Sequence, residues 1–230
     1  MTTGLPRGAA SAGEQQKNAS LRLYLVRHGE TVWALSGQHT GLTDIPLTAR
    51  GEDEARELGR SLRAISFAHA LTSPRQRARR TQALALPGIA AEIEPDLAEW
   101  NYGDYEGLRT ADILREQTDW NLFRDGCPQG EMPAQVSDRA DRLIARLRGL
   151  EGNVALFSHG QFGGVLAARW IGLPLTAAQH FPLSTASLSI FGYALHHAEI
   201  PVIALWNAAP RKIFDPLNKP QEPTGASDGQ

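Results

Sequence analysis

Two histidines, each followed by glycine, have neighbours that could handle an anion. His28 follows Arg27 in the run RHGE, and His159 follows Ser158 in the run SHG. An arginine beside an imidazole sets a permanent positive charge next to a nucleophile or base. Gly29 leaves the backbone uncrowded, so that a bulky anion can approach. Taken alone, the first run could be a surface turn and the second a histidine packed at a helix start.

A third cluster, residues 73–81 (SPRQRARRT), carries four arginines where we expect a helix to begin. The N–H groups at a helix start lack backbone partners, and together with the helix dipole they favour anions. Four arginines at successive angles of a helix cannot all face one site. Arg77 shares a face with Thr81, and we expect the other three arginines to lie on a solvated helix surface.

Carboxylates between aromatic residues form a fourth candidate, Glu99 in the run DLAEWNYGDYEG from 96 to 107. A carboxylate beside aromatic walls can have its pKa raised by desolvation and act as a general acid near neutral pH. The alternative is an ordinary loop with solvated acids. Spacing alone does not say which of these carboxylates would be the acid.

Two arginines, two histidines and a carboxylate suit phosphoryl transfer through a covalent intermediate. Arginine forks match phosphate oxygens. An imidazole can attack phosphorus in line, and a carboxylic acid can protonate the leaving alkoxide. The positive charges must be fixed in advance, because charge stabilisation is usually the largest catalytic contribution.

The elements that must position these residues alternate between strand and helix patterns. We expect strands at 21–26, 67–71, 89–93, 154–157, 187–193 and 202–206. We expect helices after Thr48, after Ser73-Pro74, over 136–147 with Gly149 suited to its end, and over about 161–171. This order predicts an α/β fold: a three-layer αβα sandwich with a mostly parallel central sheet and a small inserted cap. Ligands of such sheets lie beyond the carboxyl ends of the strands, where His28 and His159 both fall.

Composition limits the class of protein. The 230 residues carry a formal net charge of −2, which argues against a nucleic-acid partner. The 42% hydrophobic content excludes wholesale disorder. No apolar stretch has the length of a signal peptide or a membrane span, so we expect a cytoplasmic protein with no membrane partner. One cysteine, Cys127, permits neither an intrachain disulfide nor a cysteine zinc site.

Polar, Gly- and Pro-rich ends flank the alternating region. We expect a disordered N-terminal tail over 1–20 and a flexible C-terminal tail over 210–230. A single domain would then cover 21–209, with a cap segment at about 100–131 lying over the substrate. The sequence leaves open whether the chain forms a homo-oligomer.

The four runs, in this order, resemble the histidine phosphatase superfamily, also called the phosphoglycerate mutase-like family. The resemblance implies that His28 is the nucleophile that becomes phosphorylated. It implies that Glu99 protonates the leaving group and then activates water, and that His159 contacts the phosphoryl oxygens. It further implies that Arg27 and Arg77 bind the transferring group, and that neither a metal nor another cofactor is needed.

The resemblance extends to the substrate-binding residues and the cap. Beyond the two arginines, the substrate-binding set comprises Gln38, Thr40, Gly41, Tyr102 and Gly160. The segments 36–44, 99–107 and 120–131 are similar to sedoheptulose-1,7-bisphosphatase-like enzymes. On this interpretation Cys127 is a rim residue and not a catalytic thiol. Trp33, Trp100 and Trp120 could line the rim of the site or pack in the core, and for Trp33 core packing is the default expectation.

Three positions depart from the family's patterns. Ala34 stands where mutases carry an asparagine, and residues 107–110 (GLRT) replace a Gly-Leu-Asn-Lys type run. Both departures favour hydrolysis over a mutase reaction. Gly164 stands where the bisphosphatase-like relatives carry an arginine, which removes one cation that could hold a distal phosphate.

We therefore expect a metal-independent phosphatase that hydrolyses a small phosphomonoester, such as a sugar phosphate or a related metabolite, through phosphohistidine on His28. Two alternatives stay open. One is a phosphoglycerate mutase, which would return the phosphoryl group to another oxygen of the substrate. The other is a non-catalytic phosphate-binding protein, although inactive relatives usually lose the nucleophile or the acid and this chain has both.

Overall fold

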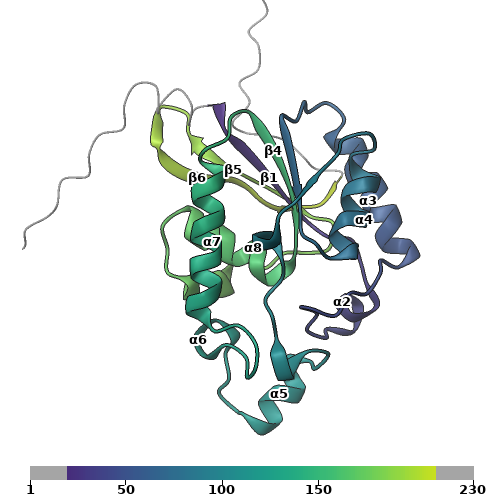
Figure 1. Ribbon diagram of the computed structural model, residues 1–230, viewed down its shortest axis with the longest axis vertical. Coiled ribbons are helices and arrows are strands. Elements are labelled where there is room, and N and C mark those ends of the chain that lie inside the picture. Colours follow the sequence, from purple (N-terminus) through teal and green to yellow (C-terminus); the bar gives the residue numbers. More distant parts are fainter. Residues whose placement is uncertain (1–19, 211–230) are drawn as a thin grey trace, which may run out of the picture.

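The computed structural model describes residues 20–210, which form a six-stranded sheet with helices on both faces (Figure 1). The strands are β1 (Arg22–Arg27), β2 (His69–Thr72), β3 (Glu92–Ile93), β4 (Asn153–Ser158), β5 (Leu188–Ala194) and β6 (His197–Ala208), in the spatial order β3-β2-β4-β1-β5-β6. The pairs β2–β3, β2–β4 and β1–β4 are parallel, whereas β5 is antiparallel to both of its neighbours. The predicted α/β fold with a mostly parallel sheet is therefore confirmed.

Seven α-helices lie within the described residues. They are α2 (Val32–Ser36), α3 (Ala49–Leu62), α4 (Gln76–Ala85), α5 (Thr110–Glu116), α6 (Leu122–Asp125), α7 (Pro133–Leu147) and α8 (Gly160–Trp170), joined by the 3₁₀ turns η1 (Pro95–Leu97), η2 (Gly103–Tyr105) and η3 (Leu175–His180). None of the helices within residues 20–210 has the length and apolar character that crossing a bilayer requires. The predicted tails lie outside the described residues except for Ser20 and Pro210.

Each face of the sheet has its own hydrophobic core, because the side chains of a strand alternate between the two faces. Leu23 and Leu25 of β1 belong to a core with residues of α7 and α8. Tyr24 and Val26 of the same strand belong to a second core with residues of α3 and α4. Because successive strand side chains point to opposite faces, one apolar strand serves both cores, and the sandwich has three layers. Figure 1 shows α3 and α4 on one side of the sheet and α7 on the other.

Most element boundaries differ from the sequence expectation by one to three residues, but the strand expected over 202–206 extends over His197–Ala208. The strand expected over 89–93 is confined to Glu92–Ile93. The helix expected directly after Ser73 begins at Gln76, with Arg75 as its N-cap residue. The Ser73 hydroxyl lies 2.7 Å from a ring nitrogen of His159. Its position therefore serves the candidate site.

Two glycines let the turn after β1 touch the start of α3 backbone to backbone. A Cβ atom on Gly29 would lie 2.4 Å from the carbonyl oxygen of Gly51, and one on Gly51 would lie 2.2 Å from that of Glu30. No side chain fits in either place. Gly29 was expected to leave room for an anion, and it serves instead the close packing of α3 against the RHGE turn.

Thr48 stabilises the contact between this turn and α3, and its removal should lower the stability of the protein. Its hydroxyl accepts a hydrogen bond from the Gly51 amide (3.0 Å) and donates one to Glu30 Oε1 (2.8 Å). We expect Thr48→Ala to lower the free energy of unfolding by about 1–2 kcal/mol, the usual cost of removing an N-cap. Urea denaturation of the full chain measures this. Thr48→Ser keeps the hydroxyl and should retain most of the stability, whereas equal losses in the two variants would contradict the assignment.

Candidate active site

His28 is the first residue after β1, and it is buried with a fixed tautomer. Its backbone amide donates to the carbonyl of Ser158 (3.0 Å), at the end of the neighbouring strand β4. Its Nδ1 lies 2.7 Å from the carbonyl oxygen of Gly29. A carbonyl only accepts hydrogen bonds, so Nδ1 carries the hydrogen. Burial, and then the charges of Arg27 and Arg77, hold the pKa of His28 well below 6.5, so the ring is neutral and Nε2 keeps its lone pair.

His159 follows β4 and faces His28. The two ring centroids are 5.2 Å apart at an interplanar angle of 61°. Nε2 of His159 lies 2.7 Å from the hydroxyl of Ser73, the residue that follows β2, whereas Nδ1 is buried without a hydrogen-bond partner. Burial, and then the charge of Arg77, lower the pKa of His159 well below its usual value. The carboxyl ends of three adjacent strands thus meet at one place, as the sequence predicted for the two histidines.

Arg27 and Arg77 bring positive charge to the two histidines from different elements. Arg27 ends β1 and donates through one terminal nitrogen to the carbonyl of Leu183. Its guanidinium lies against Gly160, where a Cβ atom would come within 3.3 Å of Cζ. Burial lowers the pKa of Arg27, and the nearby charge of Glu99 opposes that shift. A side chain at position 160 would therefore press on this guanidinium at the start of α8.

Arg77 is fully buried on α4. Its terminal nitrogens donate to the carbonyls of Thr43 (3.0 Å), Thr40 (2.9 Å) and Gly41 (3.1 Å). Thr81, one turn along the same face, accepts from the amide of Gly29 (3.0 Å) and donates to the carbonyl of Arg77 (2.8 Å). The shared face predicted for these two residues therefore supports the turn that holds His28.

Glu99 is held by backbone amides at the start of α8. Oε1 accepts from the amides of Trp100 (2.9 Å) and Phe162 (2.8 Å), and Oε2 accepts from that of Gln161 (3.0 Å). The sequence suggested a carboxyl group desolvated by aromatic walls. Instead, the ring of Trp100 is buried in the core, and the amide donors fix the carboxylate.

Unpaired polar atoms gather around His28. Five buried side-chain nitrogen or oxygen atoms in residues 20–210 have no hydrogen-bond partner. Three of them belong to the site: Nε of Arg27, Nε of Arg77 and Nδ1 of His159. Buried polar atoms are normally satisfied, so such a cluster needs an explanation. An anion with several acceptor oxygens, placed between these groups, would satisfy them together.

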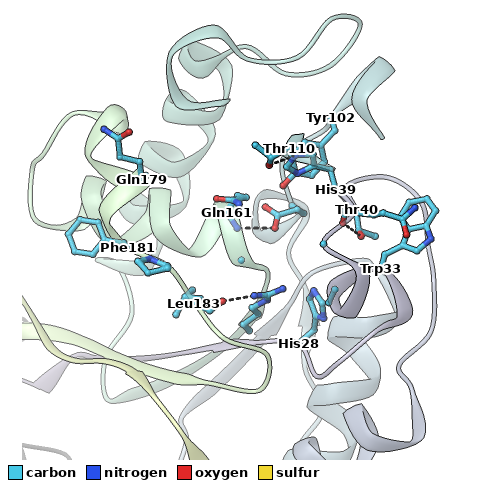
Figure 2. Close-up of a pocket in the computed structure, with 18 of the residues that line it drawn as sticks. His28, Trp33, His39, Thr40, Tyr102, Thr110, Gln161, Gln179, Phe181 and Leu183 are labelled. Atoms are coloured by element: carbon cyan, nitrogen blue, oxygen red, sulfur yellow. Dashed lines mark hydrogen bonds between the residues drawn. The ribbon is translucent and has the colours of Figure 1, made fainter. Parts of the chain in front are cut away.

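A cavity of about 390 Å³ opens over His28 (Figure 2). Arg27, His28 and Glu99 line it, and Arg77 and His159 stand directly behind this base as the charged and aromatic neighbours of His28. Four residues predicted to bind substrate line it as well: Gln38, Thr40, Tyr102 and Gly160. Gly41 does not line the cavity; its amide donates to the carboxylate of Glu106 (2.8 Å) within the 40–43 loop. The cap segment (residues 100–131) contributes Tyr102, Thr110 and Phe123.

The cavity wall also includes residues outside the predicted substrate-binding set. They are Trp33, Ala34, Gly37, His39, Thr110, Phe123, Gln161, Ala178, Gln179, Phe181, Pro182 and Leu183. Trp33 was expected in the core, but its ring is only half-buried because α2 holds it at the cavity edge above Gly107. His39 stacks on Tyr102 with ring centroids 4.5 Å apart.

Two further expectations are wrong. Cys127 is not a rim residue: it is 1% exposed within the main core, and burial raises the pKa of its thiol to about 12. Arg75 is not fully solvated, because it is half-buried with Nε unpaired. Arg79 and Arg80 are exposed as predicted, and Arg80 pairs with Glu52 at 2.7 Å. Among the described residues, no group of three or more His, Cys, Asp or Glu side chains could hold a metal ion.

Comparison with known proteins agrees with this arrangement. The family model of the histidine phosphatase superfamily (branch 1) matches residues 23–208. The chain belongs to this superfamily. An acid phosphatase of Mycobacterium tuberculosis is 40% identical over 189 residues, which cover 80% of this chain and 92% of the relative. The sedoheptulose 1,7-bisphosphatase of Saccharomyces cerevisiae is 39% identical over 184 residues, which cover 66% of this chain and 68% of the relative.

Solved structures of the superfamily share the fold. One of an open reading frame from Mycobacterium tuberculosis superposes with a TM-score of 0.77 at 38% identity, covering 82% of this chain and 98% of that one. An α-ribazole phosphatase from Shigella flexneri superposes with a TM-score of 0.73 at 31% identity, covering 82% and 96%. The resemblance drawn from four short runs thus holds over most of the chain.

The state of the His28 ring can be tested directly. Because its pKa lies well below 6.5 and Nδ1 donates to Gly29, we expect a neutral ring with hydrogen on Nδ1 at pH 6, where a free imidazole is mostly protonated. ¹⁵N NMR of histidine-labelled protein, with the signal assigned by its loss in His28→Asn, reports which nitrogen carries the hydrogen. A doubly protonated ring, or hydrogen on Nε2, would contradict the geometry.

Proposed function

We propose that this protein is a phosphatase that hydrolyses a small phosphomonoester through a phosphohistidine formed on Nε2 of His28. The observation that carries the proposal is the set of unpaired donors around a neutral, buried imidazole whose Nε2 lone pair is free. The relatives named as phosphatases support hydrolysis. The proposed chemistry draws only on side chains of this chain.

In the first step the Nε2 lone pair of His28 attacks phosphorus. The P–N bond forms, the bond to the alcohol oxygen breaks, and that oxygen takes the electron pair. It needs a proton. A phosphomonoester has a second pKa of about 6, and its monoanion carries a proton on the phosphate group. Glu99 can take up this proton and pass it to the leaving oxygen. The Nδ1–H bond to Gly29 persists throughout, so the ring keeps its orientation.

In the second step Glu99, now a carboxylate, takes a proton from water as the water oxygen attacks phosphorus. The P–N bond breaks, and its electron pair returns to Nε2 of His28. Phosphate leaves as its monoanion after taking back the proton that Glu99 received from water, so the neutral imidazole and the carboxylate of Glu99 are both restored. The amide bonds that Glu99 accepts from Gln161 and Phe162 keep it in place for both steps.

Arg27, Arg77 and His159 would hold the phosphoryl oxygens. The unpaired Nε–H of each arginine is a charge-assisted donor, which is stronger than a neutral one. The Ser73 hydroxyl already accepts from the Arg75 amide (3.3 Å), so it can donate its own hydrogen to Nε2 of His159. The ring hydrogen of His159 then lies on the unpaired Nδ1, as a further donor. Fixed donors of this kind stabilise charge that develops in the transition state.

Loss of His28 should abolish the reaction. We expect His28→Asn to reduce phosphate release from p-nitrophenyl phosphate by at least about 10⁴-fold, and to abolish acid-labile ³²P labelling, because the nucleophile is gone. His69→Asn, an exposed change at the start of β2, is the control and should keep both. Retained activity in His28→Asn would refute the mechanism. Interconversion of 2- and 3-phosphoglycerate without phosphate release would favour the mutase alternative.

The role of Glu99 predicts a dependence on the leaving group. We expect Glu99→Gln to lower kcat/KM by about 10²–10⁴-fold for an alkyl phosphate, whose alkoxide needs a proton. For p-nitrophenyl phosphate, whose leaving group is stable as an anion, the loss should stay below about tenfold. Steady-state kinetics on both esters, with the thermal unfolding midpoint as a check on folding, measures the difference. Equal losses on the two esters would exclude Glu99 as the proton donor.

A further inference from the structure

We propose that the cavity selects phosphomonoesters whose alcohol is uncharged and carries an apolar ring. This inference rests on the proposed phosphatase function and names its substrate class. Two features of the wall support it: its charge is confined to the base, and aromatic residues on one side and apolar residues on the other flank the space above the base.

The charge of the cavity matches one phosphoryl group. Among the wall residues that the structure describes, Arg27 is the one lysine or arginine, and it lies beside His28 and Glu99. The other polar wall residues are the uncharged side chains Gln38, Thr40, Tyr102, Thr110, Gln161 and Gln179, together with His39. Burial lowers the pKa of His39, so its ring adds no positive charge near neutral pH.

Arginines of the cap segment do not alter this balance. Arg109 pairs with Asp112 at 2.9 Å, and Arg124 pairs with Asp125 at 2.7 Å. Neither arginine lines the cavity. A second phosphate or a carboxylate on the substrate would therefore lose hydration among neutral side chains and gain no cation in return, which is unfavourable.

Aromatic residues line one side of the space above His28, and apolar residues line the other. Figure 2 shows Trp33, His39 and Tyr102 on one side, Phe181 and Leu183 on the other, and His28 between them at the base. The indole of Trp33 lies over Gly107, where a Cβ atom would come within 3.2 Å of it. An apolar ring on the alcohol would lose its water-exposed surface between these walls, which favours binding.

The second wall, formed by residues 178–183, depends for its position on Gly164. Phe181 is held edge-on against Trp206, with ring centroids 5.4 Å apart. A Cβ atom on Gly164 of α8 would lie 2.9 Å from the carbonyl oxygen of Phe181 and 3.1 Å from that of Ala178. The absence of a side chain at 164 thus lets the segment 178–183 lie directly on α8 and present neutral residues to the cavity.

A matched pair of esters tests the charge requirement. 4-(Carbamoylmethyl)phenyl phosphate and 4-(carboxymethyl)phenyl phosphate have the same ring and nearly the same leaving group, but the second carries an extra negative charge. We expect kcat/KM at pH 7 to be at least about tenfold higher for the neutral ester. Equal values would overturn the substrate class while leaving the phosphatase function intact. Release of phosphate from neither ester would overturn both.

A designed cation should reverse the preference. Gln179 is exposed on the second wall, so Gln179→Arg places a guanidinium there with little risk to folding. We expect this variant to raise kcat/KM for the carboxymethyl ester about tenfold and to leave the carbamoylmethyl ester nearly unchanged. Gln179→Met, of similar length and neutral, is the control and should change neither. No gain in Gln179→Arg would contradict the proposal that charge at this wall sets the selection.

A second pair of variants tests the preference for an apolar ring on the alcohol. Trp33→Ala should lower the preference for the carbamoylmethyl ester over glycerol 1-phosphate, a neutral ester without a ring, by about tenfold. Leu35→Ala, on the same helix but 71% exposed and off the cavity wall, should leave that preference unchanged. An unchanged preference in Trp33→Ala would show that the wall does not bind a ring and would overturn that half of the proposal.

Discussion

One hydrogen bond decides what the site can do, the bond from Nδ1 of His28 to the carbonyl of Gly29. It fixes the tautomer and turns the lone pair of Nε2 away from the turn that carries the ring. Burial and two neighbouring arginines keep the ring uncharged, so this lone pair is available below neutral pH. The turn itself holds its shape because Gly29 and Gly51 pack backbone to backbone. The packing of α3 against this turn therefore also sets the orientation of the nucleophile.

The register of the sheet places the partners of this imidazole. β1 and β4 pair with Arg27 opposite Ser158, so His28 and His159 are the next residues on two adjacent parallel strands. β2 pairs with β4 so that Thr72 lies opposite Phe157, which brings Ser73 to the same edge. The 40–43 loop completes the arrangement. Its amides donate to Glu106 and its carbonyls accept from Arg77, so the buried arginine is held on one side and leaves Nε free.

The sequence predicted what local patterns determine. Apolar runs ending in His-Gly located both histidines at strand ends, because strand period and strand termination are local properties. The surroundings of a side chain were not predictable where residues far away in the sequence form them. Two of the three amides that hold Glu99 come from Gln161 and Phe162, more than 60 residues away. Cys127 was misplaced because nothing in its neighbourhood shows that the cap segment packs into the main core.

The second cavity wall illustrates the same limit. Gln179 and Phe181 carry no pattern that marks a binding site, and their position depends on how closely a later segment can approach α8. Gly164 permits that approach, but the sequence shows only that a glycine stands where the bisphosphatase-like relatives carry an arginine. Its structural effect, a neutral wall brought inward, becomes visible only when the packing of the two segments is known.

A crystal structure of the protein with bound orthovanadate would test the central claim most directly, because vanadate takes up the five-coordinate geometry of phosphoryl transfer. The account predicts vanadium bonded to Nε2 of His28, with equatorial oxygens on Nε of Arg27, Nε of Arg77 and Nδ1 of His159, and with Glu99 beside the axial oxygen opposite the ring. Vanadate bound elsewhere in the cavity, or beside His28 with those three nitrogens still unpaired, would contradict it.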